Sequence, residues 1–159
     1  DGRTYSTQQL VSAIGKSDKV SDECSKYATT VITLSNKYNT DPLLVTAIMA
    51  QESSCNVGTR DSSKGCAGLM QICSFDLCTN IGTENEIRTN YQKNIECGVK
   101  IFKDKFSTSS RSFQCGNIDH IYKDWSYAVR GYVGWGCDDF HVNYVMSVND
   151  RYEDLKSNV

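Results

Sequence analysis

Glu52 is the residue whose type and position most clearly allow acid–base chemistry. It lies four residues after Ile48 and eight after Leu44, so it continues the apolar face of a helix predicted over 41–52. At the C-terminal end of such a helix, partial desolvation and the helix dipole both favour the neutral acid and predict a raised pKa. A carboxylic acid of this kind beside a polar loop is suited to general acid catalysis. The alternative is a structural role, in which the side chain simply turns into solvent.

Eight cysteines are the second chemically informative set. None forms a C-x-x-C pair, and neither histidine stands at metal-ligand spacing from a cysteine, so we expect no metal and no other cofactor. Four disulfides in a secreted, extracellular protein are the prediction, with buried thiols in a cytosolic protein as the alternative. Spacing alone does not select the pairing. The set is Cys24, Cys55, Cys66, Cys73, Cys78, Cys97, Cys115 and Cys137.

The length and net charge of the chain limit the classes of function that it can have. A chain of 159 residues is expected to form one domain. Lys plus Arg number 17 and Asp plus Glu number 19, for a net charge of -2, which argues against nucleic-acid and membrane-surface partners. No apolar run approaches the roughly 20 residues of a membrane span. A beginning at Asp1 without a charged and apolar leader is what a processed secreted protein would show.

Helical periodicity positions these residues and predicts a mainly α domain with disulfide-stapled loops. Asp41 followed by Pro42 is a helix start signal, and it places Glu52 at the far end of that helix. The stretch 53–66 is rich in Ser, Gly, Asn and Asp, which predicts a loop. Apolar residues at three- and four-residue steps predict further helices over 27–38, 91–106, 118–133 and 139–155.

Two segments in this order carry a family resemblance. Glu52-Ser53 is followed, sixteen residues after the glutamate, by Gly68-Leu69-Met70-Gln71-Ile72. The pair resembles the signature of the lytic transglycosylase and goose-type lysozyme group, glycoside hydrolase family 23. Three later segments are similar to further family motifs and stand in the expected order. They are Asn94–Gly98, Gly131–Val133 and Asn143–Val148.

The resemblance implies a fold and an activity. It runs from about Asp41 to Tyr152 and implies a single lysozyme-like catalytic domain over 1–159. Residues 1–40 would be an N-terminal helical extension packed on it. The implied partner is a polysaccharide, and the implied reaction is cleavage of the β-1,4 bond between N-acetylmuramic acid and N-acetylglucosamine in peptidoglycan.

Residue roles follow from the resemblance in the same way. Glu52 would be the general acid, and Ser53 would orient it and line the cleft. Tyr132 and Tyr144 would lie near the glutamate and contact substrate, although both also sit on apolar stripes where packing in the core is the ordinary role. The wall of the sugar-binding groove would consist of Gly68, Leu69, Met70 and Gln71.

The mechanism leaves two possibilities. Glycosidases commonly use two carboxylates, and Asp61 is the only acidic residue between Glu52 and Gly68. Family members with a short gap use one glutamate, the N-acetyl group of the substrate and its 6-hydroxyl, and they leave a 1,6-anhydro product. That transglycosylase reaction is the hypothesis. Hydrolysis by a water that Asp61 positions, as in a muramidase, is the competitor.

Two departures from the family keep other functions open. Val133 stands where the family has asparagine, and eight cysteines exceed what bacterial members usually carry. A polymer of N-acetylglucosamine such as chitin is therefore an alternative substrate. A catalytically inactive carbohydrate-binding module on the same fold, and a cysteine-rich toxin or effector that binds no sugar, are the further alternatives.

Overall fold

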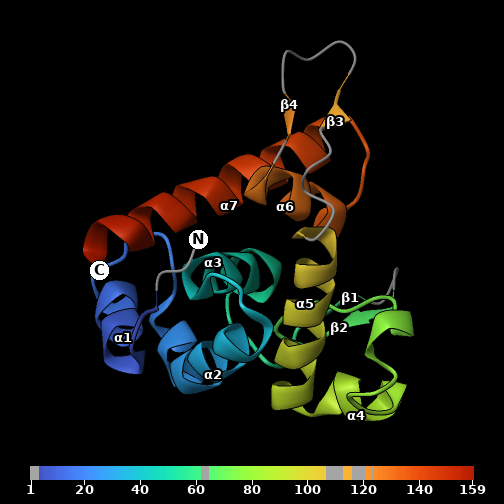
Figure 1. Ribbon diagram of the computed structural model, residues 1–159, viewed down its shortest axis with the longest axis horizontal. Coiled ribbons are helices and arrows are strands. Elements are labelled where there is room, and N and C mark those ends of the chain that lie inside the picture. The colour runs from blue at the N-terminus through green and yellow to red at the C-terminus, as the bar shows by residue number, and fades with distance from the viewer. Residues whose placement is uncertain (1–3, 62–64, 107–112, 116–120, 123) are drawn as a thin grey trace.

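The computed structural model describes residues 4–61, 65–106, 113–115, 121–122 and 124–159, and within them the chain is mainly helical (Figure 1). Two antiparallel pairs of two-residue strands are the remaining regular structure in these ranges. The pairs are β1 (Arg60–Asp61) with β2 (Cys66–Ala67), and β3 (Phe113–Gln114) with β4 (Ile121–Tyr122). The α-helices are α1 (Thr7–Gly15), α2 (Ala28–Tyr38), α3 (Pro42–Ser53), α4 (Glu84–Thr89), α5 (Tyr91–Phe106), α6 (Trp125–Val133) and α7 (Asp139–Asn158). The 3-10 helices are η1 (Asp22–Tyr27) and η2 (Asp76–Cys78).

Helix α3 is the centre of the packing and begins as the sequence predicts. The Asp41 side chain accepts a hydrogen bond of 2.8 Å from the backbone N–H of Leu43, and Pro42 occupies the first turn. Helices α2 and α7 pack against α3, and Figure 1 shows α7 crossing over it. Every residue from Pro42 to Ala50 is consequently buried. The apolar face predicted for this helix is buried, and its other faces are buried too, because neighbours cover the helix on all sides.

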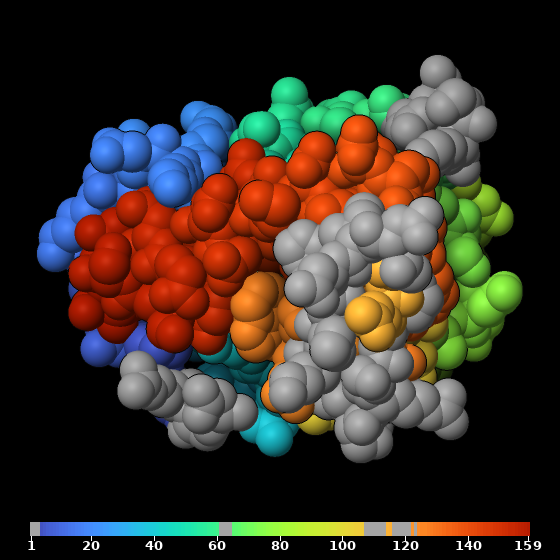
Figure 2. Space-filling view, turned by 90° about the horizontal axis from the view of Figure 1, so that it is seen from above, coloured from blue at the N-terminus to red at the C-terminus, as the bar shows by residue number. Residues whose placement is uncertain are grey.

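The long helices α5 and α7 surround this centre. Helix α5 packs against α2, α4 and α6, while α7 packs against α1, α3 and α6. Asp138 caps α7 through a 3.0 Å bond from the backbone N–H of His141. Figure 2 looks onto α7 and shows the N-terminal residues in blue beside its C-terminal end. The predicted helices over 27–38, 91–106 and 139–155 are confirmed by α2, α5 and α7.

The helix predicted over 118–133 is wrong in its first part. Ile121 and Tyr122 form β4, and α6 begins only at Trp125, while 118–120 lie outside the described residues. Asp124 has φ 55°, a left-handed conformation that a continuous right-handed helix does not accommodate. The apolar spacing around 121–125 suits either structure, so periodicity alone did not separate them.

All eight cysteines form disulfides, as predicted, and the structure supplies their pairing. The bonds join Cys24 to Cys55, Cys66 to Cys73, Cys78 to Cys97 and Cys115 to Cys137. Two of the four bonds involve the segment that follows α3 or the turn that follows β2, namely Cys24–Cys55 and Cys66–Cys73. Within the described part of the chain, none of the helices has the length and apolar character needed to cross a membrane.

Candidate active site

A groove of about 530 Å³ opens at the C-terminal end of α3. Helix α3, the segment after β2, and helices α5, α6 and α7 all contribute to its lining. Its polar side chains include Gln51, Glu52, Gln71, Ser74, Lys105, Tyr132 and Tyr144. Its apolar side chains include Ile72, Leu77, Ile101, Val133 and Phe140. This mixture of convergent polar groups and apolar walls is typical of a ligand site.

Glu52 is the one acidic residue among the described residues that line this groove. It lies in the last turn of α3, one residue before the helix ends at Ser53. Its side chain is partly exposed, whereas the preceding turns of the helix are buried. The rigid central helix therefore delivers one carboxyl group to the groove.

Two tyrosines surround this carboxyl group. The Tyr132 hydroxyl donates a 2.7 Å hydrogen bond to the backbone oxygen of Met70, and burial, followed by the negative charge of Glu52, raises the pKa of Tyr132 well above 10. The same two causes, in the same order, raise the pKa of Tyr144 well above 10. The Tyr144 hydroxyl is buried, and a side-chain hydrogen bond with Glu52 also contributes to its raised pKa. Both phenols stay protonated at neutral pH. The single Tyr132 proton is already donated to Met70, so only the Tyr144 hydroxyl faces Glu52 as a donor.

The turn at 68–71, which we call the wall, contributes Gln71 to the groove lining and is fastened to α3. The Ser53 hydroxyl is buried and donates to the backbone oxygen of Leu69 at 2.8 Å, with the Met49 oxygen at 3.1 Å. The Gln71 side-chain amide donates to the backbone oxygens of Thr59 and Gly68, each at 2.9 Å. Ser53 thus holds the backbone of the turn in place through a buried hydrogen bond, and it is not among the residues that line the groove.

Asn94, on α5, holds the same turn from the other side. Its side chain is buried, accepts a 2.9 Å bond from the N–H of Met70, and donates to the backbone oxygens of Ala67 and Ile87 at 2.9 and 3.1 Å. Gly68 has φ +86°, and a Cβ there would lie 2.2 Å from the Asn94 amide. Only glycine permits this approach together with this backbone conformation.

A second close approach, between Met70 of the turn and Gly98 of α5, fixes the distance between the turn and this helix. A Cβ on Gly98 would lie 2.6 Å from the Met70 side chain, which is fully buried. The disulfide between Cys66 and Cys73 closes the base of the turn, and both cysteines line the groove. The wall is therefore held by a disulfide, by buried hydrogen bonds and by glycine contacts.

The structure brings together four of the predicted site residues in the lining: Glu52, Gln71, Tyr132 and Tyr144. Gly68, Leu69 and Met70 form the turn, although the latter two side chains are buried and do not face the groove. Asp61 lies in β1, and its side chain lies outside what the structure describes. In the described ranges, no three His, Cys, Asp or Glu side chains gather in a way that would hold a metal ion.

Sequence reasoning missed several groove residues, of which Lys105 and Phe140 are examples. Lys105, on α5, lines the groove, and its side chain passes Gly131, where a Cβ would lie 2.9 Å from the lysine Cγ. Phe140 fits the apolar pattern of α7, yet it is 60% exposed and lines the groove. No local signal separates either residue from an ordinary helical position, because both depend on which helices meet.

The class of protein follows from these features. A mainly α chain with four disulfides, in which the last turn of a central helix places a glutamate in a groove, is a lysozyme-like all-α domain. The family model of the transglycosylase SLT domain matches residues 29–134, more than half of the chain. The chain belongs to this family, whose members are lytic transglycosylases. No curated protein matches the chain.

Proposed function

We propose that this protein cleaves the β-1,4 bond between N-acetylmuramic acid and N-acetylglucosamine in peptidoglycan, with Glu52 as the general acid. The observation that carries the proposal is the position of Glu52. Of the described residues lining the groove it is the only acidic one, and it stands between two neutral tyrosines at the end of a buried helix. Membership of the transglycosylase SLT domain family supports the reaction class.

In the proposed reaction Glu52 gives its proton to the glycosidic oxygen as the bond from that oxygen to C1 breaks. The carbonyl oxygen of the substrate's N-acetyl group supports the positive charge that develops at C1. The 6-hydroxyl of the same sugar then attacks C1 and returns its proton to the Glu52 carboxylate. The product is a 1,6-anhydro sugar, and the enzyme regains its starting state without a second carboxylate.

Mass spectrometry of the products of digested peptidoglycan tests this proposal. We expect anhydro-muropeptides as the primary products. Products heavier by one water would instead indicate hydrolysis and would favour a muramidase in which Asp61 positions the water. Release of soluble fragments from chitin but not from peptidoglycan would favour a chitin-type substrate. Binding without cleavage of either polymer would favour an inactive carbohydrate-binding module.

The rate is expected to fall as pH rises through the pKa of Glu52, because an acid catalyst must begin the reaction protonated. Tyr132 and Tyr144 do not add a second ionisation near neutral pH, since their pKa values lie well above 10. The measurement is kcat/KM on soluble muropeptide chains between about pH 4 and pH 9, with circular dichroism to confirm folding at each point. A rate that keeps rising into the alkaline range would contradict this role for Glu52.

Lys105 favours peptidoglycan over chitin as the substrate, because it is the only cationic side chain among the described residues that line the groove. Stem peptides of peptidoglycan carry carboxylates, whereas chitin is neutral. A partly exposed charge pair contributes about 1 kcal/mol, so we expect Lys105→Gln to lower kcat/KM on peptidoglycan about five-fold. Lys103→Gln, on the same helix but outside the groove lining, is the matched control.

Substrate choice decides the outcome of this comparison. Glycan chains from which an amidase has removed the stem peptides keep only the lactyl carboxylates, and chitin oligomers carry none. We expect the loss in Lys105→Gln to shrink along this series. An equal loss on all three substrates would show that Lys105 acts on the fold of the groove and not on a substrate carboxylate.

We also propose that the protein is secreted. All eight cysteines form disulfides, and disulfides persist in oxidising compartments such as the extracellular space.

A further inference from the structure

Gln51 lines the groove immediately before Glu52 on α3, and the proposed reaction gives it no task. Its side chain is half-buried. In the described structure its amide group has one hydrogen bond, which Nη1 of Arg151 donates to Oε1 of Gln51 at 2.5 Å. Arg151 lies on α7, 100 residues further along the chain. One long-range contact therefore decides how this amide stands in the groove.

The chemistry of the two side chains fixes the orientation of the Gln51 amide. A guanidinium group has only N–H donors and no acceptor, so the amide oxygen of Gln51 must be the atom that pairs with it. The amide nitrogen is on the other branch of the same planar group and is thereby turned away from Arg151. Its two N–H donors have no partner among the described residues. Because Gln51 lines the groove, these donors are available to a ligand there.

Gln71 of the wall has the opposite orientation. Its amide nitrogen donates to the backbone oxygens of Thr59 and Gly68, each at 2.9 Å, and these two bonds use both of its N–H groups. The amide oxygen is the atom of Gln71 that remains for a ligand. The two glutamines of the groove lining therefore differ in chemistry, and Gln51 is the one that can donate.

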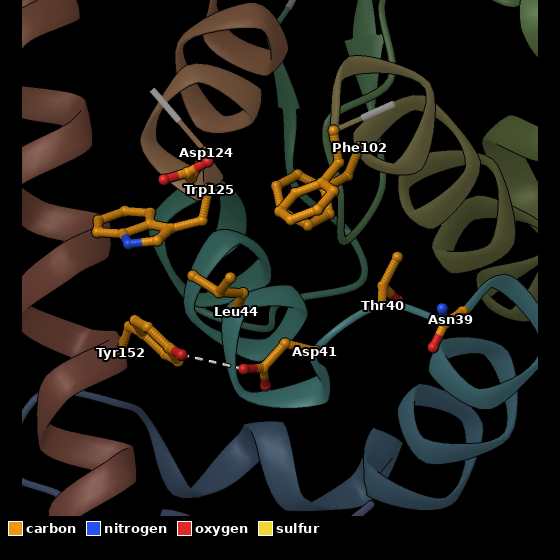
Figure 3. A pocket seen from close by; sticks show the side chains of 9 residues that line it. Asn39, Thr40, Asp41, Leu44, Phe102, Asp124, Trp125 and Tyr152 are labelled. Carbon is orange, nitrogen blue, oxygen red and sulfur yellow. Dashed lines mark hydrogen bonds between the residues drawn. The ribbon is translucent and has the colours of Figure 1, made fainter. Parts of the chain in front are cut away.

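Arg151 reaches Gln51 from a helix that is itself held in place. Its Nη1 also lies 3.4 Å from the backbone oxygen of Ser147, one turn earlier on α7. The next residue, Tyr152, is buried and donates a 3.0 Å hydrogen bond to Asp41 at the N-terminal end of α3 (Figure 3). Two consecutive residues of α7 thus bind opposite ends of α3, which keeps the guanidinium at a fixed place relative to the groove.

We propose that Gln51 binds substrate by donating from its amide nitrogen to a neutral acceptor oxygen of the glycan, and that Arg151 is the residue that positions this amide. The proposal rests on the proposed function, because it takes a glycan as the ligand of the groove. A cation such as Lys105 suits a carboxylate, whereas an uncharged N–H donor suits a carbonyl or hydroxyl oxygen. The carbonyl of an acetamido group and a sugar hydroxyl share this chemistry.

Isothermal titration calorimetry tests the binding role of Gln51. Every protein in the series carries Glu52→Gln, so that the ligand is not cleaved, and we call this variant the parent. The first ligand is the peptide-free tetrasaccharide of alternating N-acetylglucosamine and N-acetylmuramic acid. Gln51→Met keeps the size of the side chain but removes the donor. We expect it to bind this ligand about five-fold more weakly than the parent does, as loss of one neutral hydrogen bond predicts.

Two further ligands identify the acceptor. Chitotetraose keeps the acetamido groups but has no lactyl carboxylate, and cellotetraose has hydroxyls in place of the acetamido groups. A loss in Gln51→Met with both acetamido sugars, but not with cellotetraose, identifies an acetamido carbonyl. An equal loss with all three identifies a hydroxyl. Unchanged binding of the first tetrasaccharide, or a loss with that ligand alone, overturns the proposal, because the acceptor is then absent or is a carboxylate.

A double-mutant cycle tests the positioning role of Arg151. Arg151→Met leaves the amide free to turn over, and we expect two- to five-fold weaker binding of the first tetrasaccharide. Arg151→Lys keeps a donor and should restore most of this affinity. If Arg151 acts through Gln51, then Arg151→Met causes no further loss in a protein that already carries Gln51→Met.

An electrostatic effect of Arg151 is the competing explanation. Burial and then the charge of Glu52 raise the pKa of Tyr144, and the charge of Arg151 opposes this rise, so its charge is felt in the groove. Such an effect does not need Gln51. An equal loss from Arg151→Met in the presence and absence of Gln51→Met would therefore overturn the positioning role.

Tyr152→Phe is the matched control, because it removes the neighbouring bond between α7 and α3 and leaves Arg151 in contact with Gln51. We expect its affinity to equal that of the parent. Weakening by the same factor as in Arg151→Met would show a general loosening of α7 and would overturn the specific role. Failure of the proposed function gives a different result, in which the wild type cleaves no peptidoglycan although binding still depends on Gln51.

Discussion

Replacing Glu52 by glutamine is expected to lower kcat on peptidoglycan by about three orders of magnitude, within the range for loss of a general acid. Glutamine keeps the size of the side chain and its hydrogen-bonding capacity, but it has no acidic proton to give to the glycosidic oxygen. No other acidic residue of the described groove lining can replace it. The measurement is the rate of release of soluble products from purified cell walls.

The fold and the groove should survive this substitution. The Glu52 side chain is partly exposed, so we expect the free energy of unfolding to change by less than about 1 kcal/mol. Glu23→Gln is the matched control, because Glu23 is an exposed glutamate of η1 that pairs with Lys26. Its activity should equal that of the wild type. Equal activity of Glu52→Gln and the control would show that Glu52 is not the acid.

Binding distinguishes loss of chemistry from loss of the site. Glu52→Gln is expected to sediment with insoluble peptidoglycan as the wild type does, since Lys105, Gln71 and the apolar walls remain. An inactive wild type that still binds peptidoglycan would support the carbohydrate-binding alternative. The same assay therefore separates the proposed enzyme from an inactive module on the same fold.

Local signals were sufficient for the long helices. Asp41 with Pro42, and Asp138 before the last helix, are capping patterns, and the structure shows both caps as hydrogen bonds. Two further helices carried signals that went unused. Ser6 with Gln9 and Thr83 with Glu86 form capping boxes at the beginnings of α1 and α4. Short helices of this kind were predictable in principle, although their apolar stripes are brief.

Features that depend on tertiary contacts were not predictable. The all-round burial of α3 follows from the helices around it and not from its own period. Disulfide pairing is another example, because Cys24 meets Cys55 only when η1 packs near the end of α3. Lys105 and Phe140 line the groove because helices α3, α5, α6 and α7 meet there. None of these contacts produces a recognisable pattern in the local sequence of the residues that make it.

The candidate site was more predictable than its supports. A polar residue at the end of an apolar helix is visible in one chain, and so is a Gly-Leu-Met-Gln turn. The residues that hold this turn lie on other elements. Ser53 and Asn94 bind its backbone from α3 and α5, so their function depends on the distance between those helices. The geometry of the groove is consequently a property of buried hydrogen bonds as much as of its exposed residues.

Replacing Asn94 by alanine is expected to destabilise the fold by about 3–5 kcal/mol. The substitution removes one acceptor and two donor contacts. It leaves the N–H of Met70 and the oxygen of Ile87 without this buried partner, while the Ala67 oxygen keeps its 3.1 Å bond from the Ile72 N–H. Each such group costs about 1–3 kcal/mol, and partial relaxation reduces the sum. Urea denaturation measures the change, with Asn80→Ala, at an exposed asparagine that bonds Lys100, as the matched control.

The same substitution should damage catalysis before it unfolds the protein. The disulfide between Cys66 and Cys73 keeps the base of the turn closed, so the turn above it can shift while the helices remain folded. Gly68 then loses the amide that it packs against, and Gln71 no longer holds a fixed position in the groove. We expect faster hydrogen exchange at the Met70 amide, together with a raised KM under conditions where the protein is still folded. Unchanged exchange at Met70, or stability equal to that of Asn80→Ala, would show that Asn94 does not support the wall.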